Sequence, residues 1–126
     1  MIVVTQHTVF SMARVAQGPT LYVSGQTPAL PDGSVPAGAE AQTRVVLDKI
    51  AAILNEHGLG WAAVVKLTYY LCDVGDLGAL RAALFDVLPE PRPAATLVVI
   101  SGLVDSRFVV EIDAVADCGV TGVTGA

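Results

Sequence analysis

The chain has 126 residues, of which 53% are hydrophobic and 15% are charged, and its formal net charge at pH 7 is −5. Such a length suits one domain with a sizeable core, and the acidic balance argues against a nucleic-acid surface, which needs clustered Lys and Arg. No uncharged apolar run reaches the roughly 18 residues of a membrane span, and residues 1–10 lack the basic start of a secretory signal. We therefore expect a cytoplasmic protein with neither a membrane nor a nucleic-acid partner.

Thiol and imidazole groups are too sparse to form a recognisable metal or redox motif. Cys72 and Cys118 are far apart in the sequence and too few for a disulfide framework, so we expect two free thiols, with a single disulfide as the alternative. His7 and His57 have no second His or Cys at ligand spacing. We interpret His7 as an exposed residue near a strand end and His57 as a favourable side chain at a helix C-terminus. We expect no metal and no cofactor.

The first half of the chain predicts two short strands and a long helix. Met1–Val9 and Leu21–Gln26 have the composition of strands, and residues 27–38 hold three prolines and form a loop. Over Ala39–His57 the apolar residues recur at intervals of three and four, which is typical of a helix with one packed face. Gly58 follows at the position where glycine commonly ends a helix.

The second half predicts three further strands and one further helix. Val64–Cys72 alternates, as a strand with one buried face does. Leu77–Val87 has helical spacing, and Asp76 before it is a suitable N-cap. Ala95–Ile100 is almost continuously apolar, which is typical of a strand covered on both faces. Phe108–Asp117 alternates again and forms the last strand.

The order of these elements predicts the fold class. The sequence β-β-α-β-α-β-β over residues 1–118 indicates one α+β domain, with a mixed sheet and two helices on one face. The other face of the last strand carries Glu111 and Asp113, about 7 Å apart. For so small a chain, the apolar excess indicates burial between subunits. Residues 119–126 repeat Gly-Val-Thr, and we expect a flexible tail.

Three segments of the sequence resemble one known family. Residues 23–26 read Val-Ser-Gly-Gln, residues 93–95 read Pro-Ala-Ala, and residues 111–114 read Glu-Ile-Asp-Ala. They resemble the Val-Ser-Gly-Gln, Pro-Ala-Arg and Glu-Ile-Glu-Ala segments of the RidA (YjgF) family of reactive-imine deaminases, and the resemblance covers residues 10–116. It implies a chorismate-mutase-like α+β fold and a homotrimer with small-molecule clefts between its subunits.

Two residues match positions of the family's ligand site. Gly25 corresponds to a glycine of the family whose backbone lines the pocket. A residue without a Cβ allows a ligand to approach the backbone closely. The alternative for Gly25 is a simple bend at a strand end. Glu111 matches a glutamate that positions water in the family, so we predict that it is catalytic. The alternative for Glu111 is a structural carboxylate, and we interpret Asp113 as structural or solvent-facing.

Four positions that depart from the family complete the predicted substrate-binding residues. Phe10 stands where many members have a tyrosine at the mouth of the site, and it lacks the hydroxyl. Leu97 stands where cysteine is frequent, and Arg81 stands where asparagine is usual. Arg81 is otherwise an ordinary exposed helix residue. Ala95 replaces the arginine that binds the substrate carboxylate, a contact that a planar guanidinium makes well.

The missing arginine shapes the functional hypothesis. Its loss costs about 2–4 kcal/mol of substrate binding unless Arg81, or Arg14 or Arg92 of a neighbouring subunit, replaces it. We expect a hydrolase that deaminates an uncharged or bulkier imine or enamine to a keto compound and ammonia. The alternative is a trimeric small-molecule-binding or protein-protecting module without turnover. An endoribonuclease, an older label in the family, is a third possibility that the acidic charge disfavours.

Overall fold

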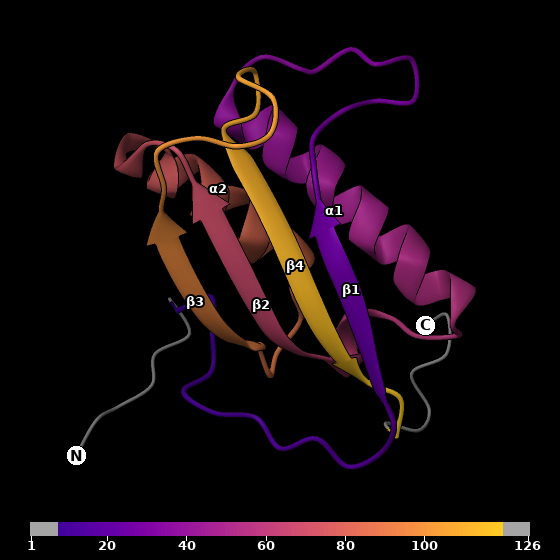
Figure 1. Ribbon diagram of the computed structural model, residues 1–126. Coiled ribbons are helices and arrows are strands. Elements are labelled where there is room, and N and C mark those ends of the chain that lie inside the picture. Colours follow the sequence, from indigo (N-terminus) through magenta and orange to yellow (C-terminus); the bar gives the residue numbers. More distant parts are fainter. Residues whose placement is uncertain (1–7, 120–126) are drawn as a thin grey trace, which may run out of the picture.

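The computed structural model describes residues 8–119 (Figure 1). Its strands are β1 (Thr20–Gln26), β2 (Val64–Leu71), β3 (Ala94–Val99) and β4 (Val110–Asp117), and its α-helices are α1 (Ala39–Glu56) and α2 (Leu77–Val87). The strands form one sheet in the order β1-β4-β2-β3. Strand β4 runs antiparallel to β1 and β2, whereas β2 and β3 are parallel. A parallel pair requires a crossover connection, and α2 lies within it.

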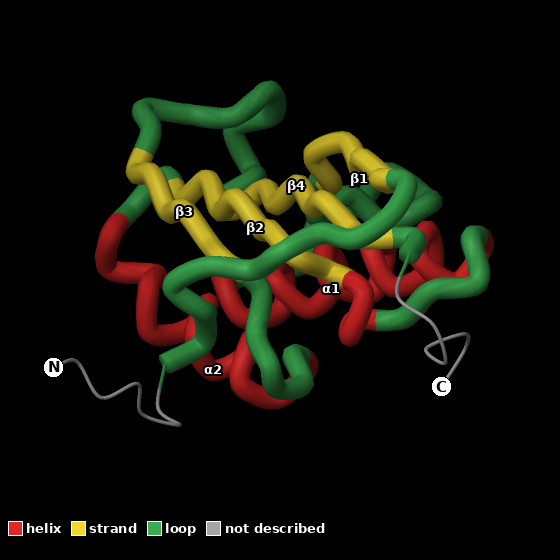
Figure 2. The backbone as a smooth tube through the Cα atoms, turned by 90° about the horizontal axis from the view of Figure 1, so that it is seen from below, coloured by secondary structure: helices red, strands yellow, loops and turns green. Residues whose placement is uncertain are grey.

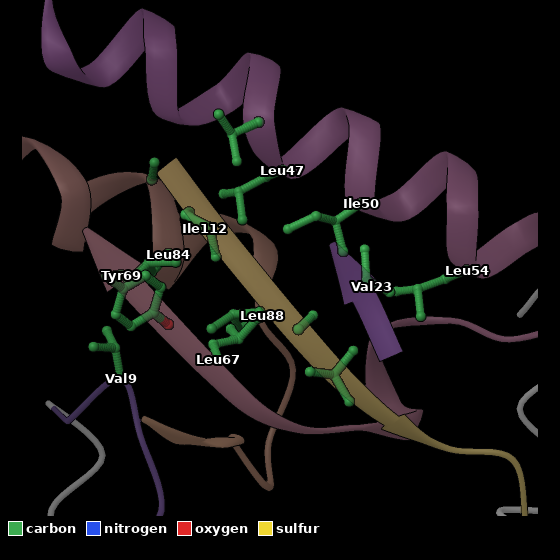
Figure 3. Close-up of a cluster of buried hydrophobic side chains, with 14 of the residues drawn as sticks. Val9, Val23, Leu47, Ile50, Leu54, Leu67, Tyr69, Leu84, Leu88 and Ile112 are labelled. Atoms are coloured by element: carbon green, nitrogen blue, oxygen red, sulfur yellow. The ribbon is translucent and has the colours of Figure 1, made fainter. Parts of the chain in front are cut away.

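Both α-helices cover the same face of the sheet, and within residues 8–119 no α-helix covers the other face (Figure 2). The alternation within β2 and β4 explains the arrangement, because Leu67, Tyr69 and Ile112 are buried while the residues between them are half-buried. Leu47 and Ile50 of α1 pack against the helix-covered face of the sheet and complete the same core (Figure 3). The two faces of the sheet therefore have different chemistry, one apolar and one mixed.

The predicted boundaries lie within one or two residues of the observed ones for the five strands and helices after residue 38 and for β1. Gly58 has a φ of 71°, in the left-handed region that glycine favours, which confirms it as the residue that ends α1. The predicted cap of α2 is wrong in its detail. Asp76 precedes α2 but its carboxylate makes no capping bond, and Asp73 instead accepts a hydrogen bond from the Gly75 N–H at 2.8 Å.

The prediction that Ala95–Ile100 is covered on both faces is wrong for the single chain. Among the described residues, β2 is the only strand that pairs with β3, and a single isolated bridge joins Ala94 to Ser11, so β3 forms an edge of the described sheet. Val98 is 38% exposed and Val99 is 50% exposed. An apolar run is typical of a buried strand, but burial depends on the order of strands in the sheet, which the run itself does not encode. Residues 8–119 therefore leave apolar side chains exposed at this edge of the sheet.

Two predictions fall on the ends of the chain. The strand predicted over Met1–Val9 lies outside the described residues apart from Thr8 and Val9, which are not in a strand. The tail predicted over residues 119–126 likewise lies outside them beyond Gly119, so the domain limits stay predictions. Neither helix between residues 8 and 119 is long and apolar enough to cross a membrane.

Candidate functional site

A pocket of about 370 Å³ lies between α2 and the β3 edge of the sheet; we call it the α2–β3 pocket. Its walls come from residues 8–10, β2, α2 and β3. Four of the predicted substrate-binding residues line it, namely Phe10, Arg81, Ala95 and Leu97. The remaining side chains of its wall are mostly aliphatic. A concave, mainly apolar space with few polar groups is the usual form of a small-molecule site.

The local sequence explains why these side chains face one another. The residues that α2 contributes recur at intervals of three or four, so they share one helix face: Leu77, Leu80, Arg81 and Leu84. Ala95 and Leu97 are alternate residues of β3 and point to the helix-covered face. In the parallel register Leu97 is opposite Tyr69 of β2. The methyl group of Ala95 leaves space here that a longer side chain would fill.

Phe10 is held at the pocket by contacts between the N-terminal segment and the loop before β3. The Ser11 backbone N–H donates to the Pro93 carbonyl at 2.9 Å, and its hydroxyl donates to the Arg92 carbonyl. The Arg14 guanidinium donates to the Pro91 carbonyl at 3.0 Å. Arg92 donates to the Thr8 carbonyl at 3.4 Å. In their own chain, both arginines are therefore engaged in holding the segment that carries Phe10.

Arg81 is the one cation of the chain without a polar partner among the described residues. All seven Lys and Arg residues lie between residues 8 and 119, and the other six make hydrogen bonds or ion pairs there. Arg81 is exposed on α2 and lines the α2–β3 pocket. A guanidinium carries five N–H donors in a planar fork that matches a carboxylate. Its donors are available to a ligand in the pocket.

Gly25 and Glu111 lie together, but not at the α2–β3 pocket. A Cβ at position 25 would overlap the Glu111 carboxylate, so the glycine is what lets this side chain lie over β1. Glu111 is opposite Tyr70 in the sheet, on the face that the helices leave open. One chain therefore places the predicted catalytic carboxylate and the predicted binding residues on opposite faces of its sheet.

The open face around Glu111 also carries a structural polar pair. The Tyr70 hydroxyl donates to Asp113 Oδ2 at 2.9 Å. This hydrogen bond, together with slight desolvation and the negative charges of Asp113 and Glu111, raises the pKa of Tyr70 above its usual value. Asp113 thus has a partner within the sheet, as the structural interpretation of this residue expects, and Glu111 makes no comparable bond among the described residues.

The sequence analysis missed Tyr69 as a site residue. It reads as one member of the buried face of β2, between Leu67 and Leu71. The structure places it in the wall of the pocket, and its hydroxyl is buried without a hydrogen-bond partner among the described residues. Burial raises the pKa of this hydroxyl well above its usual value. The sequence feature that could have indicated it is a tyrosine, with its polar hydroxyl, between two leucines on the buried face of the strand.

Metal-binding side chains are not gathered anywhere in the described part of the chain. Between residues 8 and 119, no group of three or more His, Cys, Asp or Glu side chains is placed to hold a metal ion. Cys72 and Cys118 are both free thiols. The expectation that the protein works without a metal or cofactor stays a prediction, since a cofactor can bind through other groups.

Residues 5–118 match the family model described as Endoribonuclease L-PSP, so the chain belongs to this family, which includes YjgF and RidA. The resemblance inferred from the three sequence segments is thereby confirmed. Among solved structures, RidA from an Antarctic Psychrobacter is 32% identical, with a TM-score of 0.75 over 92% of this chain and 91% of that one. This likeness confirms the α+β, chorismate-mutase-like fold.

Curated relatives carry names that bear on activity and location. Escherichia coli TdcF, named provisionally as a reactive intermediate deaminase, is 28% identical over 103 residues, which are 79% of each chain. The protein mmf2 of Schizosaccharomyces pombe is 34% identical over 85 residues, which are 67% of each chain, and is named as mitochondrial. Because this relative is named as mitochondrial, the expected cytoplasmic location stays a prediction.

Proposed function

We propose that this protein is a RidA-type hydrolase that deaminates a small imine or enamine and differs from arginine-containing members in its substrate choice. One observation carries the proposal: Phe10, Arg81, Ala95 and Leu97, the positions to which the family resemblance assigns ligand contacts, line a single pocket. The relative TdcF, named provisionally as a reactive intermediate deaminase, supports the reaction class.

The composition of the pocket favours a substrate with a substantial apolar part. Leucines of α2, Leu97 and the Phe10 ring form most of the wall. The small side chain of Ala95 leaves room for a larger substituent than an arginine at that position would. Arg81 approaches from α2 rather than from β3, so a carboxylate bound to it lies at a different place from one bound at position 95. We infer that the substrate is bulkier or less charged than the simplest imino acids.

Completion of the site requires a second subunit in this proposal. Glu111 and the α2–β3 pocket lie on opposite faces of one sheet, so a homotrimer would bring Glu111 and Gly25 of one subunit to the pocket of its neighbour. Two uncovered surfaces support such an assembly. The edge strand β3 exposes Val98 and Val99, and the open face exposes Tyr22, which is 76% accessible. Exposed apolar surface and an unpaired edge are both features that a second copy would cover.

The reaction needs one water and one proton shuttle. Water attacks the carbon of the C=N bond, and Glu111 takes a proton from that water as the C–O bond forms. Glu111 then gives this proton to the nitrogen, which completes the neutral tetrahedral carbinolamine. In the second step Glu111 takes the proton of the new hydroxyl and delivers it to the nitrogen as the C–N bond breaks, so ammonia leaves and the C–O group becomes the carbonyl of a keto compound. The sum is imine plus water giving keto compound plus ammonia, with no cofactor consumed.

Ammonia release from imines generated in situ tests the proposal. An amino-acid oxidase or a threonine dehydratase supplies imines of several side-chain sizes, and the protein should accelerate hydrolysis, more for larger apolar side chains. Glu111→Gln keeps the shape of the side chain but removes the base, so the accelerated part of the rate should fall by about 10²-fold. Asp113→Asn changes the neighbouring carboxylate on the same face and serves as the matched control.

The outcomes separate two functions. No acceleration with any imine would favour the alternative, a small-molecule-binding or protein-protecting module without turnover. The separation of Glu111 from the pocket within one chain is the observation that favours this alternative. Acceleration that Glu111→Gln leaves unchanged would remove Glu111 from the mechanism. The endoribonuclease of the family description is disfavoured by the net charge of −5, since RNA binding draws on clustered positive charge.

A further inference from the structure

Tyr69 presents an unusual polar group beside the α2–β3 pocket. Its side chain is only 3% exposed, and its hydroxyl has no hydrogen-bond partner among the described residues. Its ring lies between Val9 and Leu84, which line the pocket with it (Figure 3). Tyr69 therefore forms part of the pocket wall, and its hydroxyl is a buried polar group without a partner among the described residues.

A hydroxyl in this situation opposes folding unless something bonds to it. Leaving a buried donor without a hydrogen bond lowers the stability of the folded protein, whereas a phenylalanine would give the same ring without this penalty. The buried positions on either side of Tyr69 in β2 are both leucine, Leu67 and Leu71. Packing of the sheet therefore does not require a polar group at this position. The hydroxyl remains neutral, because burial raises the pKa of Tyr69. It is thus a hydrogen-bond donor in need of an acceptor.

We propose that the Tyr69 hydroxyl donates a hydrogen bond to an uncharged acceptor of the ligand, a carbonyl oxygen or an imine nitrogen, and so selects compounds that carry one. This inference rests on the pocket assigned under the proposed function and specifies its substrate class. Arg81 contacts the charged or polar end of the same ligand from α2. The ligand is accordingly an apolar compound with a C=O or C=N group that reaches the inner wall of the pocket.

Phe10 does not supply such a donor, and its position differs. Its ring has no hydroxyl and is 38% exposed, so it belongs to the outer part of the pocket. Tyr69 is almost fully buried and belongs to the inner part. A buried hydroxyl discriminates between ligands more sharply than an exposed one. When a ligand lacks an acceptor, water cannot reach the buried hydroxyl and bond to it instead.

A pair of probes that differ only in the acceptor tests the inference. We would measure binding of 2-oxobutanoate and of butanoate, which has the same chain and carboxylate without the keto oxygen, by titration calorimetry. The wild-type protein should prefer 2-oxobutanoate by about tenfold, the value of one well-placed hydrogen bond. Tyr69→Phe should bind the two probes equally. Val104→Ala, at a residue that is 90% exposed in the loop before β4 and outside the pocket wall, should keep the preference.

Thermal unfolding supplies a second readout that separates recognition from structure. If the hydroxyl serves a ligand, Tyr69→Phe removes an unsatisfied polar group, and the melting temperature should stay the same or rise. A melting temperature lowered by several degrees, with the preference for 2-oxobutanoate intact, would overturn the inference and give the hydroxyl a structural role.

The result is independent of the ammonia-release experiment. A preference that Tyr69→Phe abolishes would support the inference even if no imine were hydrolysed, and only the proposed catalysis would then fail. Hydrolysis together with an unaltered preference in Tyr69→Phe would overturn the inference alone. Failure of the wild-type protein to bind either probe, or to distinguish them, would also overturn it.

Discussion

Single residues in the α2–β3 pocket differ from the family pattern in a compensating way. Ala95 and Phe10 lack the guanidinium and the hydroxyl that the resemblance leads one to expect. Arg81 and Tyr69 bring one group of each kind to the same pocket, from α2 and β2. A guanidinium and a hydroxyl at new positions bind the same kinds of ligand atom at a different separation and angle. Under the proposed function, such changes would alter the choice of substrate rather than the type of reaction.

Gly25 offers a direct test of the Glu111 position. In Gly25→Ala the added Cβ would overlap the Glu111 carboxylate, whose Cδ would lie 3.0 Å away, so the side chain must turn aside. A misplaced catalytic group lowers the rate, here by about ten- to hundredfold, while the fold survives because the carboxylate is the end of a flexible chain. Initial rates of ammonia release and circular dichroism would measure the two effects.

Gly78→Ala is the matched control for this substitution. Gly78 lies in α2, and a Cβ there would meet nothing within 4 Å. Alanine in a helix stabilises by about 0.5–1 kcal/mol relative to glycine, so this variant should be slightly more stable and fully active. Equal rates of ammonia release for Gly25→Ala and Gly78→Ala would show that the reaction does not depend on the position of the Glu111 carboxylate.

At the scale of elements, the sequence predicted what depends on local periodicity. The alternation of Val64–Leu71 and Val110–Asp117 gave both the strands and their buried sides, since the pleat repeats every two residues. It could not predict that β3 is an edge strand, that Tyr69 borders a pocket, or that Glu111 faces away from Arg81. These facts depend on the order of strands and on where α2 crosses the sheet, which bring together residues distant in sequence.

The end of β4 carries a carboxylate that ties the chain to the turn before β1. Asp117 is buried and accepts hydrogen bonds from the backbone N–H groups of Gln17 at 2.7 Å, Gly18 at 3.0 Å and Gly119 at 2.8 Å. These bonds, that from Gln17 foremost, hold the pKa of Asp117 below its usual value of 3.8. The ionised carboxylate therefore stabilises the register of β1 against β4.

This carboxylate should make stability depend on pH in a defined direction. Because the folded-state pKa is the lower one, its stabilisation is present above about pH 4 and is lost as the pH falls through the folded-state value. Asp117→Asn should lower the urea midpoint at pH 7, and its difference from the wild type should shrink towards pH 3. Asp48→Asn, at an exposed α1 residue without a polar partner among the described residues, should show little difference at either pH. If the difference in urea midpoint between Asp117→Asn and the wild type did not change with pH, the ionised carboxylate would not be the source of the stabilisation.

For the whole molecule, we propose that each active site is shared between two subunits. Arg81 and Glu111 lie on opposite faces of one sheet, so neither can serve the other within a chain. A cyclic trimer is built from a head-to-tail contact, which places one surface of each copy against a different surface of the next. A homotrimer of this kind would join the α2–β3 pocket of one subunit to the Glu111 face of its neighbour and would bury the β3 edge.

Complementation between two inactive variants tests this claim most directly. Arg81→Gln and Glu111→Gln would each be purified alone and also co-expressed in equal amounts, with the trimer confirmed by sedimentation. If sites form between subunits and the trimers assemble at random, about one quarter of all sites combine an intact Arg81 with an intact Glu111, and ammonia release should recover to about that fraction of the wild-type rate. Mixed trimers no more active than the two parent variants would contradict the shared site.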